Sequence, residues 1–338
     1  MTKLLQIGLI GAGRIAQAHA ATVAYRISNA QLAVVTDPVT SAVEALAAKF
    51  RIPTIAPSYQ AILANPQIDA VLICSPTDTH AEIMKAAARA GKHIFCEKPI
   101  ALTLAATDDA LQVVDASGVK LQLGFNRRFD ANYARVRKAI TSGEIGTPQI
   151  MHIISRDPAP PPISYVKSSG GIFLDMTIHD WDMARFLSGS EIDEVYVQGG
   201  ITVDPAIGEA GDIDTHVTLL RFTNGLIGTI DNCRQAVYGY DQRVEILGTK
   251  GAIQTENNYA NNSVISGAAS IQRDLPLNFF MERYLDSYAA EIMAFVDAVL
   301  HDKPTPVTGH DGRMALLVGL AAQKSYREQR PVKVAEVG

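Results

Sequence analysis

An aspartate and a histidine with the chemistry of an acid-base pair stand four positions apart, at Asp175 and His179. On a helix, residues four apart lie on one face, so the spacing predicts that both address one ligand, with Asp182 continuing the stripe. Ile178 and Trp181 would give the same helix a face for the core. Taken alone, a helix cap at Asp175 and a hydrogen-bonded histidine at the core margin explain the pair equally well.

Composition favours a small-molecule partner. A length of 338 residues predicts about two domains, and 47% hydrophobic with 19% charged residues is an ordinary globular balance. A net charge of -5 without a Lys/Arg run argues against nucleic acid or an anionic membrane surface. The chain also lacks a signal-peptide pattern and an apolar run near the roughly 18 residues of a membrane span, so we expect a cytoplasmic protein. Cys74, Cys96 and Cys233 are expected to be buried thiols of a reducing compartment, without the spacing of a metal site.

A glycine-rich turn opens the chain. Leu5 to Ile10 reads as a buried strand, residues 11–16 (GAGRIA) as a turn, and the stretch from Ile15 towards Ile27 as a helix, which is the order of a dinucleotide-binding fingerprint. Gly11 would make the tight turn and Gly13 would let the backbone approach the pyrophosphate at the helix N-terminus. The predicted cofactor contacts here are Gly11, Ala12, Gly13, Arg14 and Ile15.

A second apolar strand supports this fingerprint. Residues 31–36 end in Asp37, 24 positions after Gly13 and near the expected spacing of about 20 for a ribose-binding acid. Asp37 would accept hydrogen bonds from the ribose hydroxyls and repel a 2′-phosphate, while Pro38 and Val39 supply no arginine to hold one. The sequence therefore favours NAD over NADP. The alternative is that Asp37 only caps the turn before Pro38.

Strands and helices continue to alternate up to residue 123. Strands are expected at 70–74, 93–96 and 120–123, with a loop at 75–80 and a helix over 81–90. Such alternation implies a parallel sheet, whose ligands collect beyond the carboxyl ends of its strands. The further cofactor candidates at those ends are Ser75, Pro76, His80, Glu97 and Lys98.

Lys98 is the most informative of these residues. It follows an apolar strand, precedes Pro99, which forces extended backbone, and lies where the nicotinamide end of the cofactor is expected. The alternative is a surface lysine whose stem lies along a strand end. The sequence leaves open whether the Lys98–Pro99 peptide is cis.

The second half of the chain is richer in strands. Residues 213–222 and 226–230 predict a hairpin with an Asn224-Gly225 turn. Further strands are expected near 150–154, 195–203, 244–247 and 263–266, and long helices over 281–300 and 312–327. We predict an α/β Rossmann domain with a doubly wound parallel sheet over 1–123. An α+β domain with an open, mostly antiparallel sheet follows over 124–338, and its last helix can pack back on the first domain.

Both halves contribute to a resemblance to a known family. The stretches that carry it are 11–16 (GAGRIA), 96–99 (CEKP), 124–130 (GFNRRFD) and the segment with Asp175 and His179. With them the chain resembles the glucose-fructose oxidoreductase, inositol dehydrogenase and rhizopine catabolism family. Residues 156–162 (RDPAPPP) followed by 170–182 are similar to its inositol 2-dehydrogenase group.

The resemblance implies a site and a reaction. Its catalytic trio is Lys98, Asp175 and His179, and its substrate contacts are Asn126, Arg127, Asp157, Asp175, His179 and Tyr240. The implied reaction is NAD-dependent oxidation of a cyclic polyol, foremost myo-inositol to its 2-ketone (2-keto-myo-inositol, scyllo-inosose), with His179 as general base. No metal is expected. A homo-oligomer is expected, with a tetramer favoured over a dimer.

Several alternatives stay open. Asn126 and Ser155 stand where some inositol dehydrogenases carry methionine and histidine, so scyllo-inositol, chiro-inositol or a sugar remain candidate substrates. Asp175, His179 and Asp182 have side chains that could also bind a metal. An NAD-dependent glycosidase and a non-catalytic NAD-binding regulator are further candidates, the regulator disfavoured by the intact trio. The proline-rich residues 157–162 predict a rigid loop at the cleft in preference to an SH3-type ligand.

Overall fold

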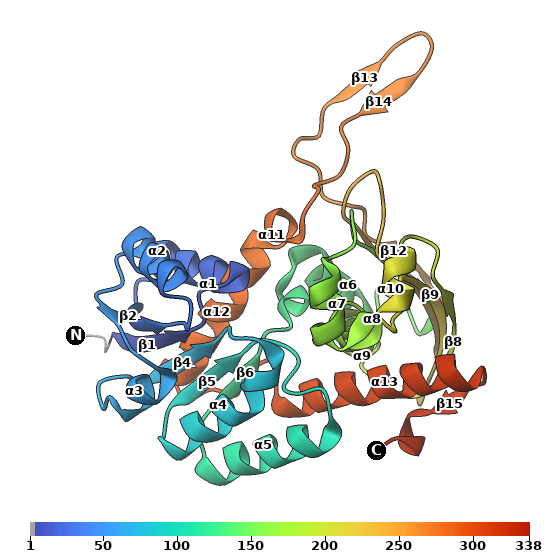
Figure 1. Cartoon of the computed structure of the whole chain (residues 1–338). Coiled ribbons are helices and arrows are strands. Elements are labelled where there is room, and N and C mark those ends of the chain that lie inside the picture. The colour runs from blue at the N-terminus through green and yellow to red at the C-terminus, as the bar shows by residue number, and fades with distance from the viewer. Residues whose placement is uncertain (1–3) are drawn as a thin grey trace. The chain divides into compact units, whose positions relative to one another are not determined.

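The chain forms two units, which Figure 1 colours along the sequence. The structure, a computed structural model, describes residues 4–338. Unit 1 comprises Met1–Phe129 with Leu285–Leu316, and unit 2 comprises Asp130–Tyr284 with Leu317–Gly338. Residues 285–316 therefore group with the first unit, whereas the sequence analysis counted them with the second domain.

Unit 1 contains a six-stranded sheet in which every strand pair is parallel. The strands run in the order β3-β2-β1-β4-β5-β6. Their bounds are β1 Leu5–Ile10, β2 Ala30–Thr36, β3 Thr54–Ile55, β4 Ala70–Ile73, β5 His93–Cys96 and β6 Leu121–Leu123. The order reverses between β1 and β4, which is the switch point where a doubly wound sheet binds its ligand. The predicted Rossmann domain is confirmed.

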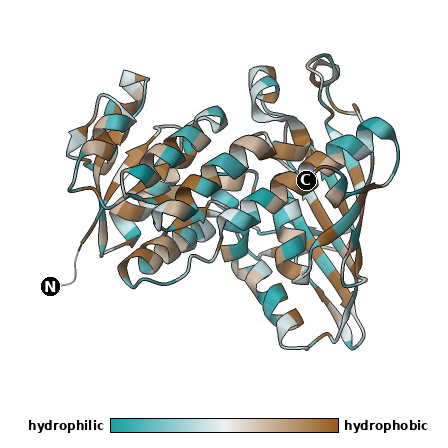
Figure 2. Cartoon of the chain, turned by 90° about the horizontal axis from the view of Figure 1, so that it is seen from below, coloured by the Kyte–Doolittle hydropathy of each residue, from teal (hydrophilic) through white to brown (hydrophobic). Residues whose placement is uncertain are grey.

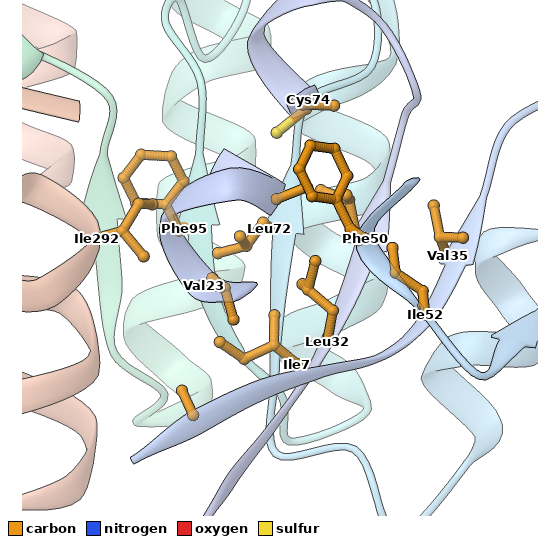
Figure 3. Close-up of a cluster of buried hydrophobic side chains, with 14 of the residues drawn as sticks. Ile7, Val23, Leu32, Val35, Phe50, Ile52, Leu72, Cys74, Phe95 and Ile292 are labelled. Atoms are coloured by element: carbon orange, nitrogen blue, oxygen red, sulfur yellow. The ribbon is translucent and has the colours of Figure 1, made fainter. Parts of the chain in front are cut away.

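Helices lie on both faces of this sheet, with α1 and α2 on one face and α4 and α5 on the other (Figure 1). The helices of unit 1 are α1 Arg14–Arg26, α2 Thr40–Phe50, α3 Tyr59–Ala64, α4 Thr77–Arg89, α5 Leu104–Ser117, the short η1 Asn126–Phe129 and α12 Leu285–Leu300. Figure 3 shows part of the core, where Ile7, Leu72 and Phe95 of the strands meet Val23 of α1. Ile292 of α12 belongs to the same cluster, which explains why this late segment groups with unit 1.

Two predicted boundaries in the helices are wrong. Helix α4 begins at Thr77, so residues 77–80, expected in a loop, form its first turn. Pro76 precedes it in an extended conformation, and Asp78 lies where a negative charge stabilises a helix start. The helix expected over 281–300 is divided at Tyr284 into α11, Phe280–Arg283, and α12.

Unit 2 contains a seven-stranded mixed sheet in the order β12-β11-β7-β10-β9-β8-β15. Strands β7 and β10 are parallel and the other pairs are antiparallel. The bounds are β7 Pro148–Arg156, β8 Ile192–Gly200, β9 Thr215–Phe222, β10 Ile227–Cys233, β11 Asp241–Gly248, β12 Gly251–Gln254 and β15 Val332–Lys333. The predicted hairpin is β9–β10, with Gly225 at a φ of 88° in its turn. The predicted open, mostly antiparallel sheet is confirmed.

The strand expected near residues 263–266 exists but lies outside this sheet. It is β13, Val264–Ser266, which pairs only with β14, Ile271–Arg273. Figure 1 shows this two-stranded hairpin projecting away from the large sheet.

One face of the large sheet is covered and the other is open. Burial alternates along β9, and Figure 2 shows hydrophobic and hydrophilic residues mixed along these strands. The helices of unit 2 are α6 Ala131–Thr141, α7 Ile163–Ser169, α8 Gly171–Asp175, α9 Ile178–Ser188, α10 Pro205–Glu209, α11, the second part of α13 Gly309–Glu328 and η2 Val334–Glu336. No helix within residues 4–338 has the length and apolar character needed to cross a membrane.

Candidate active site

Asp175 and His179 lie on two successive helices, so the prediction of one continuous helix is wrong. Helix α8 ends at Asp175 and α9 begins at Ile178. Between them, the N–H groups of Met176 and Thr177 both donate to the carbonyl of Ile172, at 3.1 and 2.9 Å. The second of these bonds spans five residues, and such widened turns are frequent at functional sites. Both Asp175 and His179 are partly exposed.

Asp182 does not share the environment of this pair. Its side chain is buried within α9, with 1% of the residue exposed. The sequence analysis placed Asp182 on the same polar stripe as Asp175 and His179. Asp182 shares α9 with His179, but its side chain is buried whereas His179 is partly exposed. Asp182 is therefore not included in our candidate site.

The chain enters α8 through a tight turn that depends on glycine. Gly170 and Gly171 have φ angles of 91° and 78°, in the left-handed region that glycine adopts without strain. Both carboxylate oxygens of Asp212 accept from the N–H of Ile172, at 3.1 and 3.0 Å, and so cap the helix. A Cβ on Gly171 would lie 2.8 Å from Asp212 Oδ1. The glycine pair thus permits the approach of the carboxylate that fixes the start of α8.

Tyr165 contacts Asp175 and was missed in the sequence analysis. Its hydroxyl donates to Asp175 Oδ1 at 2.9 Å. It lies on α7, a short helix between the proline-rich segment and α8 that the sequence analysis did not predict. Tyr165 therefore helps to orient the carboxylate that we place in the site.

The glycine-rich turn lies where the carboxyl ends of β1 and β4 meet. Gly11 has a φ of 108°, and a Cβ there would lie 2.6 Å from the carbonyl oxygen of Cys74. A Cβ on Gly13 would meet nothing within 4 Å, and Gly13 precedes α1 without a side-chain cap. The positive end of α1 therefore carries no side-chain cap, and space is open beside Gly13. These residues fit the pyrophosphate of NAD.

Asp37 is tied to this turn. Its Oδ2 accepts from the N–H of Ala12 at 2.7 Å, and its Oδ1 accepts from the N–H of Val39 at 2.8 Å. The second contact is the turn cap considered as an alternative, so Asp37 has this role whether or not it also binds ribose. Each carboxylate oxygen can accept a further bond and the residue is partly exposed, which leaves ribose binding as a prediction.

His80 connects the two segments that the sequence analysis assigned to the cofactor. It is 1% exposed, with Nδ1 2.7 Å from the Pro99 carbonyl oxygen and Nε2 2.8 Å from that of Ser75. Both ring nitrogens contact protein oxygens, so His80 can hold these two segments together, and its contact with the cofactor stays a prediction. The Lys98–Pro99 peptide is cis, and Lys98 is partly exposed at the end of β5.

Glu97 belongs to a buried cluster within unit 1. His19 Nε2 lies 2.6 Å from Glu97 Oε1, and Glu291 of α12 is fully buried beside them. Burial, and then the charge of Glu97, raise the pKa of Glu291 well above its usual range. The contact between His19 and Glu97 is a hydrogen bond, shorter than the roughly 3 Å or more that separates two ligands of one metal ion. The raised pKa therefore favours a Glu291 carboxyl group that keeps its proton in the folded protein.

This proton makes stability depend on pH. Above pH 4.5 the unfolded chain releases it while the folded chain keeps it, so stability falls as pH rises towards the raised pKa. We expect Glu291→Gln, which keeps the neutral shape, to remove a slope of up to about 1.4 kcal/mol per pH unit. Denaturant unfolding from pH 5 to 8 measures this slope. The exposed Glu209→Gln is the control, and equal slopes in wild type and Glu291→Gln would show that Glu291 is ionised when folded.

The predicted substrate contacts are divided between the units. Asn126 and Arg127 lie on η1 in unit 1, where both are buried and Asn126 Nδ2 has no hydrogen-bond partner among residues 4–338. Asp157 follows β7, and Tyr240, 6% exposed, precedes β11 with its ring edge-on to Tyr284 at 6.0 Å. Lys98 is in unit 1, and Asp157, Asp175, His179 and Tyr240 are in unit 2. Their contacts with a substrate stay predictions.

Comparison with known proteins identifies the family. The model described as "Oxidoreductase family, NAD-binding Rossmann fold" matches residues 5–125, and that described as "GFO/IDH/MocA C-terminal domain" matches residues 133–254. The myo-inositol 2-dehydrogenase of Thermotoga maritima is 45% identical over 333 residues, which cover 98% of this chain and 99% of that protein. The inositol 2-dehydrogenase of Rhizobium meliloti is 44% identical over 333 residues, again 98% and 99% of the two chains.

A solved structure agrees with these relatives. The crystal structure of scyllo-inositol dehydrogenase from Lactobacillus casei with bound cofactor NAD(H) and scyllo-inositol matches with a TM-score of 0.92 at 32% identity. The match covers 98% of this chain and 100% of that one. Since the two domain models and the full-length relatives agree with the Rossmann sheet and the glycine turn, the chain belongs to the GFO/IDH/MocA family and is an NAD-dependent oxidoreductase.

Proposed function

We propose that this enzyme oxidises myo-inositol to its 2-ketone with NAD. The observation that carries the proposal is the likeness, over 98% of the chain, to a protein named myo-inositol 2-dehydrogenase. The partly exposed carboxylate and imidazole at the junction of α8 and α9 supply the groups that such a reaction needs.

In the proposed mechanism, His179 accepts the proton of the reacting hydroxyl as general base. Asp175, held by the Tyr165 hydroxyl, orients the imidazole and binds a neighbouring hydroxyl. Lys98 donates to the reacting oxygen and stabilises the negative charge that develops there. Bound NAD supplies the acceptor for the hydride. The scheme requires Lys98 of unit 1 to act on the same substrate as the pair in unit 2.

A cyclic polyol suits the residues that we propose as its contacts. A buried polar group without a hydrogen-bond partner costs about 1–3 kcal/mol, and Asn126 Nδ2 is such a group among the described residues. A substrate with a hydroxyl on every ring carbon can accept from this amide and from Arg127 while donating to Asp157. An apolar alcohol would leave the Asn126 amide without an acceptor.

A substrate panel tests the proposal. NADH formation is followed with myo-, scyllo- and chiro-inositol and glucose, each offered with NAD and with NADP. The proposal predicts the largest kcat/KM for myo-inositol with NAD, since Asp37 repels a 2′-phosphate. A preference for scyllo- or chiro-inositol would correct the isomer and keep the reaction class. No turnover with any inositol, with NAD still bound, would contradict the proposed function.

Two rival functions are separated by direct assays. An NAD-dependent glycosidase would release nitrophenol from aryl glycosides, and a regulator would bind NAD without turning over any of the panel. The metal-dependent alternative at Asp175 and His179 predicts loss of activity on chelation. Our mechanism moves the proton to an imidazole and predicts that activity survives a chelator.

We also propose a homo-oligomer, with a tetramer favoured over a dimer. The open face of the large sheet carries exposed apolar side chains in the part of unit 2 that is described, namely Val217, Leu219, Ile227 and Leu247. Exposed apolar patches commonly mark interfaces. Leu219→Glu should reduce the mass measured by light scattering. An unchanged mass would place the interface elsewhere.

The three free thiols suit the reducing cytoplasm that we propose as the location of the protein.

A further inference from the structure

A row of buried polar side chains connects the large sheet of unit 2 to both sides of His179. Thr177, two residues before His179, is fully buried, and Asp180, the next residue after it, is fully buried as well. The side chains that reach them are His216 of β9 and Asn232 of β10, which are paired residues on neighbouring antiparallel strands. The register of this hairpin therefore places an imidazole and an amide side by side beneath the junction of α8 and α9.

The contacts form a continuous chain. Thr218 Oγ1 lies 3.1 Å from His216 Nδ1, and His216 Nε2 lies 2.9 Å from Thr177 Oγ1. Thr177 Oγ1 lies 2.5 Å from Asn232 Oδ1, and Asn232 Nδ2 lies 3.1 Å from Asp180 Oδ2. Thr177 is the residue that precedes α9, yet its hydroxyl makes no helix cap. It contacts the sheet instead, and it also lies 3.1 Å from the carbonyl oxygen of Ile172 in α8.

One assignment of protons satisfies all four contacts. The Thr218 hydroxyl donates to Nδ1 of a neutral His216, whose Nε2–H donates to Thr177. The Thr177 hydroxyl donates to the Asn232 carbonyl oxygen, and the Asn232 amide donates to Asp180. This direction requires His216 to be neutral, and burial lowers the pKa of His216 to about 3. Each of the four contacts then pairs a donor with an acceptor, and a satisfied buried polar network rigidifies its surroundings.

We infer that Asn232 and Thr177 are positioning residues that hold the His179 backbone from both sides, with the Asn232 amide joining Thr177 to Asp180. The inference rests on the proposed role of His179 as general base. It assigns a purpose to the interruption between α8 and α9, because the wide turn is what lets Thr177 reach the sheet. A general base must lie within hydrogen-bond reach of the proton that it removes, and a misplacement of 1 Å costs about 10²-fold in rate.

The test compares variants that differ by single groups. Thr177→Val removes the hydroxyl with little change of shape, Thr177→Ser keeps it, and Asn232→Leu removes the amide. We expect Thr177→Val and Asn232→Leu to lower kcat about 10- to 100-fold with NAD affinity unchanged, and Thr177→Ser to stay close to wild type. Because Thr177 and Asn232 act through the same row of hydrogen bonds, the double variant Thr177→Val/Asn232→Leu should lose little more kcat than the worse single variant. The kcat is normalised to folded protein and measured well below the melting temperature, so loss of stability alone does not move it.

Hydrogen exchange of the peptide over residues 172–182 gives a readout that does not depend on activity. The inference predicts faster exchange in Thr177→Val and Asn232→Leu and wild-type exchange in Thr177→Ser. Unchanged exchange would overturn the inference. Faster exchange with unchanged kcat would also overturn the positioning role if His179→Ala is inactive. If His179→Ala is as active as wild type, it is the proposed function that fails.

Discussion

His179→Ala is expected to lower kcat by about 10²- to 10⁴-fold, the usual cost of removing a general base. The substrate proton then has no acceptor at the junction of α8 and α9. NAD affinity should stay at the wild-type value, because the glycine turn and Asp37 are in unit 1 and His179 is in unit 2. Steady-state kinetics with myo-inositol and fluorescence titration with NAD measure the two quantities separately.

A matched histidine variant controls for this change. His301→Ala removes an exposed imidazole from the loop that follows α12, and its activity should equal that of wild type. Parallel loss of turnover and NAD affinity in His179→Ala would show a general disturbance of the fold and refute the role of general base. A small loss of kcat with a raised KM would make His179 a substrate contact only.

Lys98→Met is expected to lower kcat/KM by about 10²- to 10³-fold, the range seen when a donor to a developing oxyanion is removed. Methionine keeps most of the apolar stem and loses the ammonium group, so folding should survive. Kinetics with NAD in excess measure the effect.

Lys303→Met, which removes a half-exposed lysine far along the chain, is the control for Lys98→Met. Lys98→Arg should recover part of the activity, because it restores charge but not the geometry of a single ammonium donor. Wild-type kcat/KM in Lys98→Met would place Lys98 outside the chemistry. It would then be the surface lysine that the sequence analysis considered as the alternative.

The sequence predicted the central strands of unit 1 closely because these strands are buried on both faces. Such strands appear in the sequence as short, continuous apolar runs flanked by glycine or polar residues. Strands β1 and β5 begin and end at the expected residues. The hairpin β9–β10 was found by its Asn-Gly turn and alternating pattern. In these elements the signal is local, since each residue's own type indicates its environment.

Other features depend on contacts between residues far apart in the sequence. The interruption after Asp175 accompanies bonds that Thr177 makes to β9 and β10, and the helical periodicity of the sequence does not reveal these bonds. The same holds for Asp212, which caps α8 from 40 residues away. The placement of α12 in unit 1 depends on Ile292 joining the cluster around Phe95. Tyr165 had no motif to mark it, because its contact with Asp175 depends on a short helix, α7, that the sequence analysis did not predict.

Deuterium transfer tests the central claim most directly. The enzyme is incubated with NAD and myo-inositol that carries deuterium at C2. The reduced cofactor and the ketone product are examined by mass spectrometry. The account predicts that deuterium moves to the nicotinamide ring of NADH in equal amount to the 2-ketone formed, with a slower rate than for unlabelled substrate. A reduced cofactor without deuterium, or a ketone at another carbon, would contradict the proposed oxidation at C2.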